Sequence, residues 1–256
     1  YRKIRNTFRY LLGNLNDKFE DKSLEKLDIE NLPELEQFML HKIFCLNNKF
    51  NNYFKNYDFH NLYKELLNFC TVDLSAFYFD IRKDTLYCDP VNSDKRQSCI
   101  TVLNILLNSL LKWFAPILSF TTEEIYQLVS KKNKSIHLEN FIDFPKKFEN
   151  QNLSKKWSEL IKIRDICNIS IEEKRASKEI GSSLEAELNV KFNNKFKQIV
   201  KDIDLSELCI TSKAEISFDD QSDIIVSAQK APGKKCKVCW KIRIDPCERH
   251  PKCQIT

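Results

Sequence analysis

Glycine, proline, methionine and histidine are scarce in this chain of 256 residues, which holds three Gly, seven Pro, one Met and four His. A fold made of many short strands needs frequent turns, and Gly and Pro are residues that turns commonly use. Their scarcity therefore excludes a turn-rich sandwich or barrel. The abundant Leu, Lys and Glu residues favour long helices instead.

Catalytic signatures are also missing from the sequence. It contains no glycine-rich phosphate loop and no G-x-S-x-G turn, and none of its four histidines has an obvious nucleophile beside it. Acidic pairs at 123–124 and 172–173 fall on adjacent positions of expected helices, where side chains point in different directions. We expect no covalent chemistry from this chain alone.

Targeting and membrane signals are not evident either. Residues 1–3 (YRK) lead directly into an amphipathic segment without a cleavage site of small residues, and the apolar stretch 99–118 is interrupted by Asn, Lys and Pro. We expect a buried core helix there and no membrane partner. Six scattered cysteines in mostly apolar surroundings predict a reducing, cytoplasmic location. The first residue is not Met, so we expect the chain to begin partway through a longer protein.

Hydrophobic spacing predicts a helical bundle over residues 1–180. Apolar residues recur every three or four positions in segment 4–15. Comparable patterns and their flanking prolines predict further helices, at 34–57, 58–76, 93–114 and 154–179. Residues 77–81 are expected to lead into a turn at 82–84. A capping box at 121–124 (TTEE) predicts another helix, with Thr121 as its cap.

The pattern changes after residue 180, where a small α/β unit is predicted over residues 181–230. Alternating apolar and polar residues predict its strands, at 187–192, 207–217 and 224–228, and a short helix is expected at 196–203. Residues 231–233 (APG) are a hinge to a last, cysteine-rich segment, 231–256. The chain is thus predicted to be mainly α: a helical bundle, then a small α/β junction unit, then a zinc knuckle.

Positive charge is concentrated near the two ends of the sequence. Residues 230–256 hold eight Lys and Arg against two acids, a net charge of +6 that leaves −1 for residues 1–229. A second basic cluster, which includes Arg2, Arg5 and Arg9, opens the chain. Localized basic surfaces on a nearly neutral body predict contact with a polyanion, although a solvated helix face is the alternative for the first cluster.

Four of the ten cysteines stand close together, at Cys236, Cys239, Cys247 and Cys253. C-x-x-C spacing lets a tight turn bring two sulfurs to about 4 Å, close to the edge of a tetrahedral site with Zn–S of roughly 2.3 Å. We predict a structural Zn²⁺ site from these four residues, with His250 as an alternate fourth ligand. A segment this short buries too little apolar surface to hold together without a metal.

Trp240 directly follows the first cysteine pair and is flanked by Lys241 and Arg243. An aromatic face beside cations suits unpaired nucleic-acid bases and their phosphates. The alternative is that the Trp240 ring covers the metal knuckle.

Five segments along the sequence resemble the anticodon-binding region of bacterial-type isoleucyl-tRNA synthetases. They are residues 1–15 (YRKIRNTFRYLLGNL), 77–87 (FYFDIRKDTLY), 115–121 (APILSFT), 180–186 (IGSSLEA) and 235–240 (KCKVCW). Ordered motifs over essentially the whole length are far more specific than any one of them. The second cysteine pair departs from the family's C-x-x-C, because Cys247, His250 and Cys253 stand there instead.

The resemblance implies a class I synthetase anticodon-binding domain with an isoleucine-specific tRNA as its partner, in a monomeric enzyme. The parent enzyme joins isoleucine to its tRNA with ATP, which binds a catalytic domain carrying HxGH and KMSKS signatures. These signatures do not occur in this sequence, so the chain is expected to bind tRNA without being catalytic on its own. The expected tRNA contacts are Arg2, Arg5, Arg9, Trp240, Lys241 and Arg243.

Two alternatives to this interpretation are open. The chain could come from the corresponding region of a valyl or leucyl relative, although the C-x-x-C-W element argues against that. It could also be a freestanding zinc-containing module that binds other proteins. Salt-dependent tRNA binding distinguishes the second alternative, because a protein-interaction module would show none.

Overall fold

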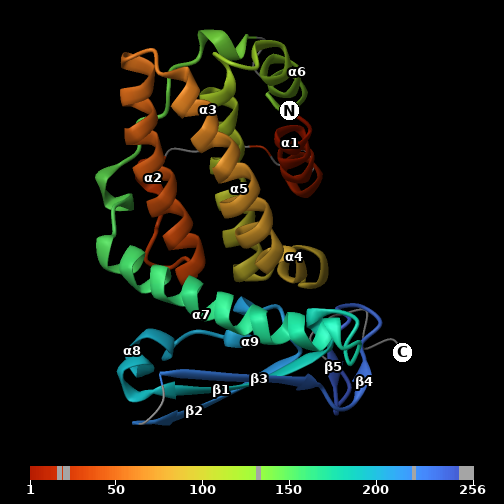
Figure 1. Cartoon of the computed structure of the whole chain (residues 1–256). Helices are drawn as coiled ribbons and strands as arrows, with labels where there is room; N and C mark the ends of the chain where they lie inside the picture. The colour runs from red at the N-terminus through yellow and green to blue at the C-terminus, as the bar shows by residue number, and fades with distance from the viewer. Residues whose placement is uncertain (16–18, 20–23, 131–133, 221–222, 248–256) are drawn as a thin grey trace. The chain divides into compact units, whose positions relative to one another are not determined.

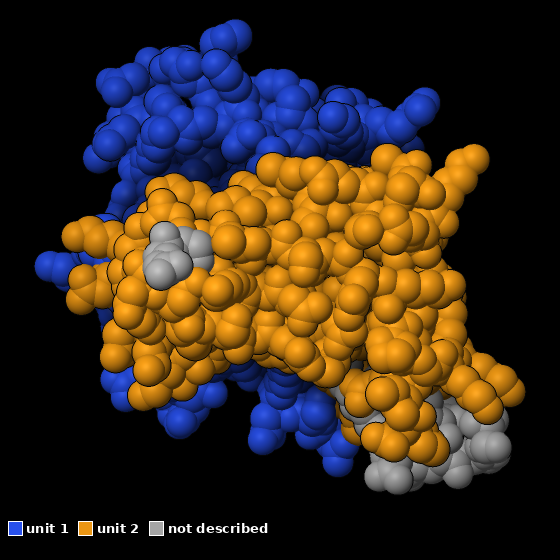
Figure 2. Space-filling model, turned by 60° about the horizontal axis from the view of Figure 1, so that its bottom comes forward, with its two compact units in different colours: residues 1–82, 91–151 blue, residues 83–90, 152–256 orange. Residues whose placement is uncertain are grey.

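Helices dominate the part of the chain that the structure describes, as the scarcity of glycine and proline predicts. The computed structural model describes residues 1–15, 19, 24–130, 134–220 and 223–247. These residues form two units, which Figure 2 colours separately. Unit 1 comprises Tyr1–Arg82 and Val91–Gln151, and unit 2 comprises Lys83–Pro90 and Asn152–Thr256. The mainly α architecture with a small sheet region is confirmed. The three segments 1–180, 181–230 and 231–256 stay a prediction.

Unit 1 is a bundle of helices with short 3₁₀ turns between some of them. Its helical segments are α1 (Arg2–Leu15), α2 (Glu34–Lys55), α3 (Phe59–Asn68), a π-helical segment (Phe69–Tyr78), α4 (Phe79–Cys88, whose end belongs to unit 2), α5 (Asp94–Phe114) and α6 (Ser119–Val129). The 3₁₀ turns are Leu24–Lys26, Ile136–Leu138 and Lys146–Phe148. Figure 1 shows α2, α3 and α5 running side by side.

The apolar helix α5 supplies the middle of the bundle core. Its leucines 103, 106, 107, 110 and 111 are fully buried. Ser93 caps its start by accepting a hydrogen bond from the Arg96 N–H, and Pro116 lies just beyond its end. Trp113 donates its indole N–H to the side-chain oxygen of Asn47 on α2 at 3.0 Å, so this large ring is buried without an unpaired donor. The predicted core helix is confirmed, and no helix of the described ranges is long and apolar enough to cross a membrane.

The helices α3 and α4 and the π segment between them form one continuous helix, so the turn predicted at 82–84 is wrong. Arg82 is 2% exposed, and its guanidinium lies against the carboxylate of Glu36 on α2, at 2.7 Å from Nε to Oε1. Tyr78 donates its hydroxyl to the same oxygen at 3.1 Å. Burial and the neighbouring Cys99 and Glu36 hold the pKa of Tyr78 well above its usual value, so the phenol keeps the proton that it donates.

The capping box predicted at 121–124 is also wrong. α6 begins at Ser119, three residues before the start that a Thr121 cap predicts, and Leu118 stands at the cap position without a side-chain cap bond. Glu123 has a different role, because its Oε2 accepts hydrogen bonds from the Ser135 hydroxyl at 2.8 Å and the Ile136 N–H at 3.0 Å. The acid therefore fixes the segment that follows α6.

Unit 2 combines one long helix with a three-stranded mixed sheet. Its elements are α7 (Gln151–Ala176, which begins in unit 1), a 3₁₀ turn (Ser183–Glu185), β1 (Ala186–Asn193), a 3₁₀ turn (Asn194–Phe196), α8 (Lys197–Val200), α9 (Leu205–Leu208), β2 (Lys213–Asp219) and β3 (Ile224–Lys230). The central strand β1 is parallel to β2 and antiparallel to β3. Alternate residues of β1, including Leu188, Val190 and Phe192, are buried, as its sequence alternation predicts.

The strand predicted over 207–217 begins later than expected. Asp204 accepts hydrogen bonds from the backbone N–H groups of Ser206 and Glu207, which caps the short helix α9. β2 therefore starts only at Lys213. The crossover through α8 and α9 is needed because parallel strands cannot be joined by a tight turn. Arg164 of α7 donates to the carbonyl of Leu208 at 2.9 Å and holds this crossover against the long helix.

Replacing Arg82 with Met tests the buried ion pair of unit 1. The change leaves the Glu36 carboxylate buried without its cation, and we expect a loss of about 3–5 kcal/mol in the free energy of unfolding. The double variant Glu36→Leu with Arg82→Met removes the stranded charge and should recover most of that loss. Urea unfolding followed by circular dichroism measures both. An unchanged midpoint for the single variant would contradict a structural role of the pair.

Candidate metal centre and nucleic-acid interface

Two short strands in unit 2 frame the cysteine cluster. β4 (Lys234–Lys235) pairs antiparallel with β5 (Ile242–Arg243). The residue before β4 is Gly233, whose φ of +115° falls in the region that favours glycine. A Cβ at this position would lie 2.0 Å from the carbonyl oxygen of Arg243. Only glycine lets the backbones of the two strands approach this closely.

The turn between these strands carries the first cysteine pair. The Cys236 N–H donates to the Lys241 carbonyl at 2.8 Å, and the Trp240 N–H donates to the Cys236 carbonyl at 3.0 Å. These two bonds close the turn. The Val238 N–H lies 3.4 Å from the sulfur of Cys236, and such a donor favours the thiolate form that binds metals.

Three of the predicted ligands come together in this turn. The sulfur atoms of Cys236, Cys239 and Cys247 all lie within 4.8 Å of one another. This spread is close to the edge of about 4 Å that a tetrahedral thiolate site requires. The cluster could therefore hold a metal ion with few changes in geometry. The predicted fourth ligand Cys253 and its alternate His250 lie outside the described residues.

The electrostatics of the cluster fit a cation. Burial raises the pKa of the Cys239 thiol to about 12; the neighbouring thiols of Cys236 and Cys247 also raise it, and a backbone hydrogen bond from Lys241 opposes them. Neighbouring thiolates repel one another, and a bound divalent ion removes that penalty. Three closely spaced thiols are a soft donor set, which suits zinc-like ions better than magnesium or calcium.

Trp240 and Arg243 are on the surface of the cysteine module. Trp240 is 59% exposed, so its ring is accessible from solvent, and Arg243 is exposed as well. Trp240 has a φ of +63°, which a bulky side chain adopts only at a cost of about 1–2 kcal/mol. The surrounding turn holds this exposed ring in a strained backbone conformation, and such strain is concentrated at functional positions.

Lys241 differs from the other predicted tRNA contacts, because it is only 7% exposed. Burial raises the pKa of Asp204, but hydrogen bonds from Ser206 and Glu207 and the charge of Lys241 outweigh this and leave that pKa lowered. The charge of Lys241 thus acts on the acid that caps α9, and its side chain is buried within unit 2.

The predicted contacts Arg2, Arg5 and Arg9 lie on α1 in unit 1, and all three are exposed. The opposite stripe of this helix is the buried one, with Ile4 and Phe8 at 0% and 1% exposure. The guanidinium of none of the three arginines forms a hydrogen bond or ion pair with the residues that the structure describes. Their guanidinium groups are therefore available to an external anion.

Two residues that support the cysteine module were missed by the sequence reasoning. Ser212 accepts a hydrogen bond from the Ile242 N–H at 2.6 Å and donates its hydroxyl to the Leu184 carbonyl. Glu185 accepts from the Gly181 N–H at 2.9 Å and pairs with Lys235 at 3.2 Å. Both residues tie β4 and β5 to the segment before β1. Glu185 belongs to the 180–186 motif, but a sequence motif does not show which of its residues face the module.

A cysteine and a histidine also lie close together in unit 1, but they do not form a nucleophile and its base. The sulfur of Cys45 is 3.5 Å from Nε2 of His41, while Nδ1 of the same ring accepts a hydrogen bond from the Asn150 N–H. The neutral ring must therefore carry its own proton on Nε2, and it has no site for the thiol proton. Burial lowers the pKa of His41, whereas burial and Glu149 raise that of Cys45. Both shifts oppose an imidazolium–thiolate pair.

A helical bundle with an exposed basic first helix, joined in sequence to a small sheet unit with a thiol cluster, agrees with the family comparison. Residues 36–191 match the family described as the anticodon-binding domain of tRNA ligase, so the chain belongs to that family. The match covers more than half of the 256 residues and includes most of the helical bundle and β1.

Within this family the chain is similar to isoleucine–tRNA ligases. It is 66% identical over 250 residues to the isoleucine–tRNA ligase of Pelagibacter ubique, a match that covers 98% of this chain and 28% of the relative. The enzymes of Caldicellulosiruptor saccharolyticus and Bartonella quintana are 39% and 38% identical over 94% and 96% of the chain. The chain spans about a quarter of the length of these relatives. The resemblance seen in the sequence motifs is confirmed.

Proposed function

We propose that this chain recognises the anticodon of an isoleucine tRNA, as part of an isoleucine–tRNA ligase. The observation that carries the proposal is the family match over residues 36–191, together with the three relatives described above, each of which is named as an isoleucine–tRNA ligase. In this proposal the chain supplies tRNA binding, and the ATP-dependent joining of isoleucine to tRNA takes place outside it. The protein is a cytoplasmic monomer in the same proposal.

The cysteine module holds a structural Zn²⁺ in this proposal. Cys236, Cys239 and Cys247 supply three thiolates, and Cys253 or His250 supplies the fourth ligand. Support comes from the clustering of the three sulfurs and from the Val238 N–H directed at one of them. When bound, the ion links β4, β5 and the residues that follow, which have too little core of their own to fold separately.

RNA recognition is divided between positioning and discrimination. Phosphate contacts fix the register of the RNA but do not distinguish one sequence from another, whereas contacts with bases do. The exposed arginines Arg2, Arg5 and Arg9 are suited to phosphates of the anticodon stem, because a guanidinium can bind a phosphate through two parallel hydrogen bonds. Trp240, with Arg243 beside it in sequence, is suited to an unpaired loop base. The burial of Lys241 removes that residue from the proposed contacts.

The most direct test compares the binding of isoleucine tRNA with that of the same tRNA carrying a swapped anticodon. We expect the swap to weaken binding, since each well-formed base contact contributes about 1–3 kcal/mol of discrimination. Trp240→Ala should cost roughly 1–3 kcal/mol for the cognate tRNA by loss of stacking. Trp240→Gly should lose the same affinity and also relieve the strained φ. Equal affinity for both tRNAs would contradict anticodon recognition, and an unchanged Trp240→Ala variant would contradict stacking.

Zinc content provides a separate prediction for the cysteine module. The purified chain should hold about one zinc per molecule, and Cys239→Ala should lose it, because that thiol is the buried member of the cluster. Cys45→Ala is a matched control in unit 1 and should keep the metal. Mass spectrometry and Co²⁺ absorption spectra measure occupancy and ligand type. Comparing Cys253→Ala with His250→Ala identifies the fourth ligand, and full zinc content in Cys239→Ala would contradict the site.

The role of α1 is tested by the salt dependence of tRNA binding. Arg5→Ala should weaken binding to cognate and swapped tRNAs alike, because a phosphate contact carries no sequence information. The slope of log K against log salt should fall in magnitude by about 0.9 for one lost contact with a duplex stem. Lys146→Ala, an exposed lysine of the same unit, is the control. An Arg5→Ala slope equal to that of the control would remove α1 from the interface.

A further inference from the structure

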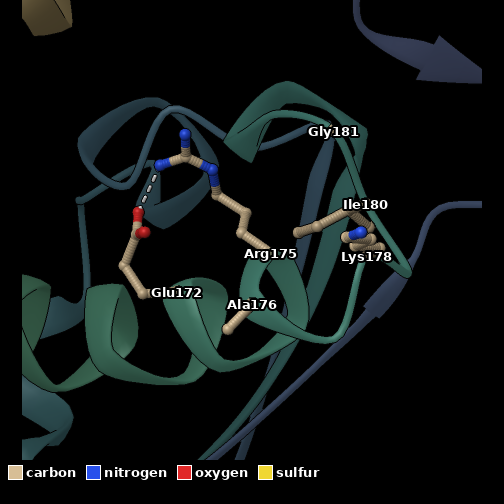
Figure 3. A pocket seen from close by; sticks show the side chains of 6 residues that line it. All are labelled: Glu172, Arg175, Ala176, Lys178, Ile180 and Gly181. Atoms are coloured by element: carbon tan, nitrogen blue, oxygen red, sulfur yellow. Dashed lines mark hydrogen bonds and ion pairs between the residues drawn. The ribbon is translucent and has the colours of Figure 1, made fainter.

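A cavity of about 520 Å³ lies at the end of α7 in unit 2 and has no part in the proposed contacts so far. It is lined by Glu172, Arg175, Ala176, Lys178, Ile180 and Gly181 (Figure 3). Figure 3 shows that these residues come from the last turns of α7 and from the loop that follows it. The lining combines a guanidinium and an ammonium with an apolar patch.

One residue of the cavity lining, Lys178, has a strained backbone conformation. Lys178 follows the last turn of α7 with a φ of +60°, in the left-handed region where helices usually end on glycine. The Lys178 N–H donates to the Arg175 carbonyl at 3.0 Å, and the Glu179 N–H donates to the Lys174 carbonyl at 3.1 Å. These bonds terminate the helix. A lysine at this position costs about 1–2 kcal/mol that glycine would not.

The charges around the cavity leave a cation without a partner. Glu179 is held by Lys174 at 2.9 Å and by the Ser177 hydroxyl at 3.0 Å, and Glu185 is held by Lys235 and the Gly181 N–H. The ammonium of Lys178 forms no hydrogen bond or ion pair with the described residues. Glu179 and Glu185 are therefore engaged by groups other than Lys178, and Glu172 is the acid in the cavity lining itself.

Arg175 is only loosely engaged. It pairs with Glu172 at 2.6 Å, but both side chains are about half exposed, and exposed pairs of this kind contribute at most about 1 kcal/mol. A guanidinium has five N–H donors, so it can bind an incoming anion without leaving Glu172 entirely. The cavity lining thus includes two cationic groups, Arg175 and Lys178.

We propose that this cavity binds a backbone phosphate of the RNA whose loop base lies on Trp240. Arg175 and Lys178 contact the phosphate oxygens, and Ala176 and Ile180 lie against the sugar. This inference rests on the proposed function and extends its RNA surface from the cysteine module to α7. Glu185 makes the two places continuous, because it binds the Gly181 N–H at the cavity and Lys235 in β4.

The end of α7 also explains why a tethered phosphate, rather than a free anion, is the ligand. The C-terminus of a helix carries a partial negative charge, which weakens the binding of a bare anion there. A phosphate that belongs to an RNA already held by the cysteine module is present at high effective concentration and overcomes this penalty. The cavity is therefore specific for a second contact of a bound RNA.

Lys178→Gly provides the test, because it removes the ammonium and at the same time relieves the strained φ. The variant should fold at least as stably as the unchanged protein, and its thermal midpoint checks this. Its affinity for the isoleucine tRNA should fall about three- to tenfold, and its salt slope should fall in magnitude by about 0.7–0.9 over roughly 50–200 mM salt. Arg175→Gln should show the same change, and zinc content should be unaltered in both variants.

Lys201→Ala is the matched control, since Lys201 is an exposed lysine after α8, which Figure 1 shows at the other end of the sheet from β4 and β5. If Lys178→Gly binds tRNA with the affinity and slope of this control while Trp240→Ala is impaired, the cavity inference is overturned and the proposed function stands. If the unchanged chain shows no salt-dependent tRNA binding, both are overturned.

Discussion

The buried pair between Glu36 and Arg82 is the constraint on which unit 1 depends. Both side chains are excluded from water, at 0% and 2% exposure, so neither charge is tolerated without the other. Tyr78 completes the set by donating to Glu36. The pair fixes α2 against the continuous helix at the point where that helix leaves unit 1, because Arg82 is the last residue of that part of the unit. Apolar contacts hold these two helices together, whereas the ion pair fixes their register, because it joins one particular turn of α2 to one particular turn of the continuous helix.

Both units contain residues other than glycine in backbone conformations that glycine adopts more easily. The chain places non-glycine residues in the left-handed region at Tyr57, Lys178, Ile210 and Trp240. Tyr57 and Lys178 lie just after long helices, where glycine would be easier to accommodate. Three of the four carry aromatic or basic side chains, and Trp240 and Tyr57 are strongly exposed. Local strain and surface chemistry thus coincide at Lys178 and Trp240. Of the three glycines of the chain, Gly233 is the one at which an added Cβ would collide with the backbone.

The sequence was sufficient for the features that depend on local pattern. The apolar period and Pro116 predicted α5, alternation predicted β1, and C-x-x-C spacing predicted that Cys236 and Cys239 lie together. The sequence was not sufficient where the conformation of a segment depends on a residue far away in the chain. The segment at 82–84 has the composition of a turn, yet Arg82 is buried because it pairs with the carboxylate of Glu36, 46 positions earlier in the chain.

Lys241 shows the same limit within the candidate site. It stands in a basic run that looks solvated, but its side chain is buried and its charge lowers the pKa of Asp204 on another segment. The cavity at the end of α7 was not predicted either. Ile180 and Gly181 of its lining belong to the 180–186 motif, but its two cations are three residues apart at what looks like an ordinary charged helix end. Spacing along a chain reports the neighbours on one element, and it does not report which element packs against it.

The π segment between α3 and α4 has a consequence for helical phase. Six residues spaced four apart are 0–2% exposed: Leu62, Leu66, Cys70, Leu74, Tyr78 and Arg82. In an α-helix of 3.6 residues per turn, each step of four advances by about 40°, so five steps would rotate the last residue by roughly 200°. A π turn bonds residue i to i+5 and holds more residues, so the same step of four falls short of a full turn there. The segment Phe69–Tyr78 therefore reverses the drift and returns Arg82 to the buried side. A strict spacing of four between buried residues, sustained from Leu62 to Arg82, is the sequence pattern that this wider turn makes possible.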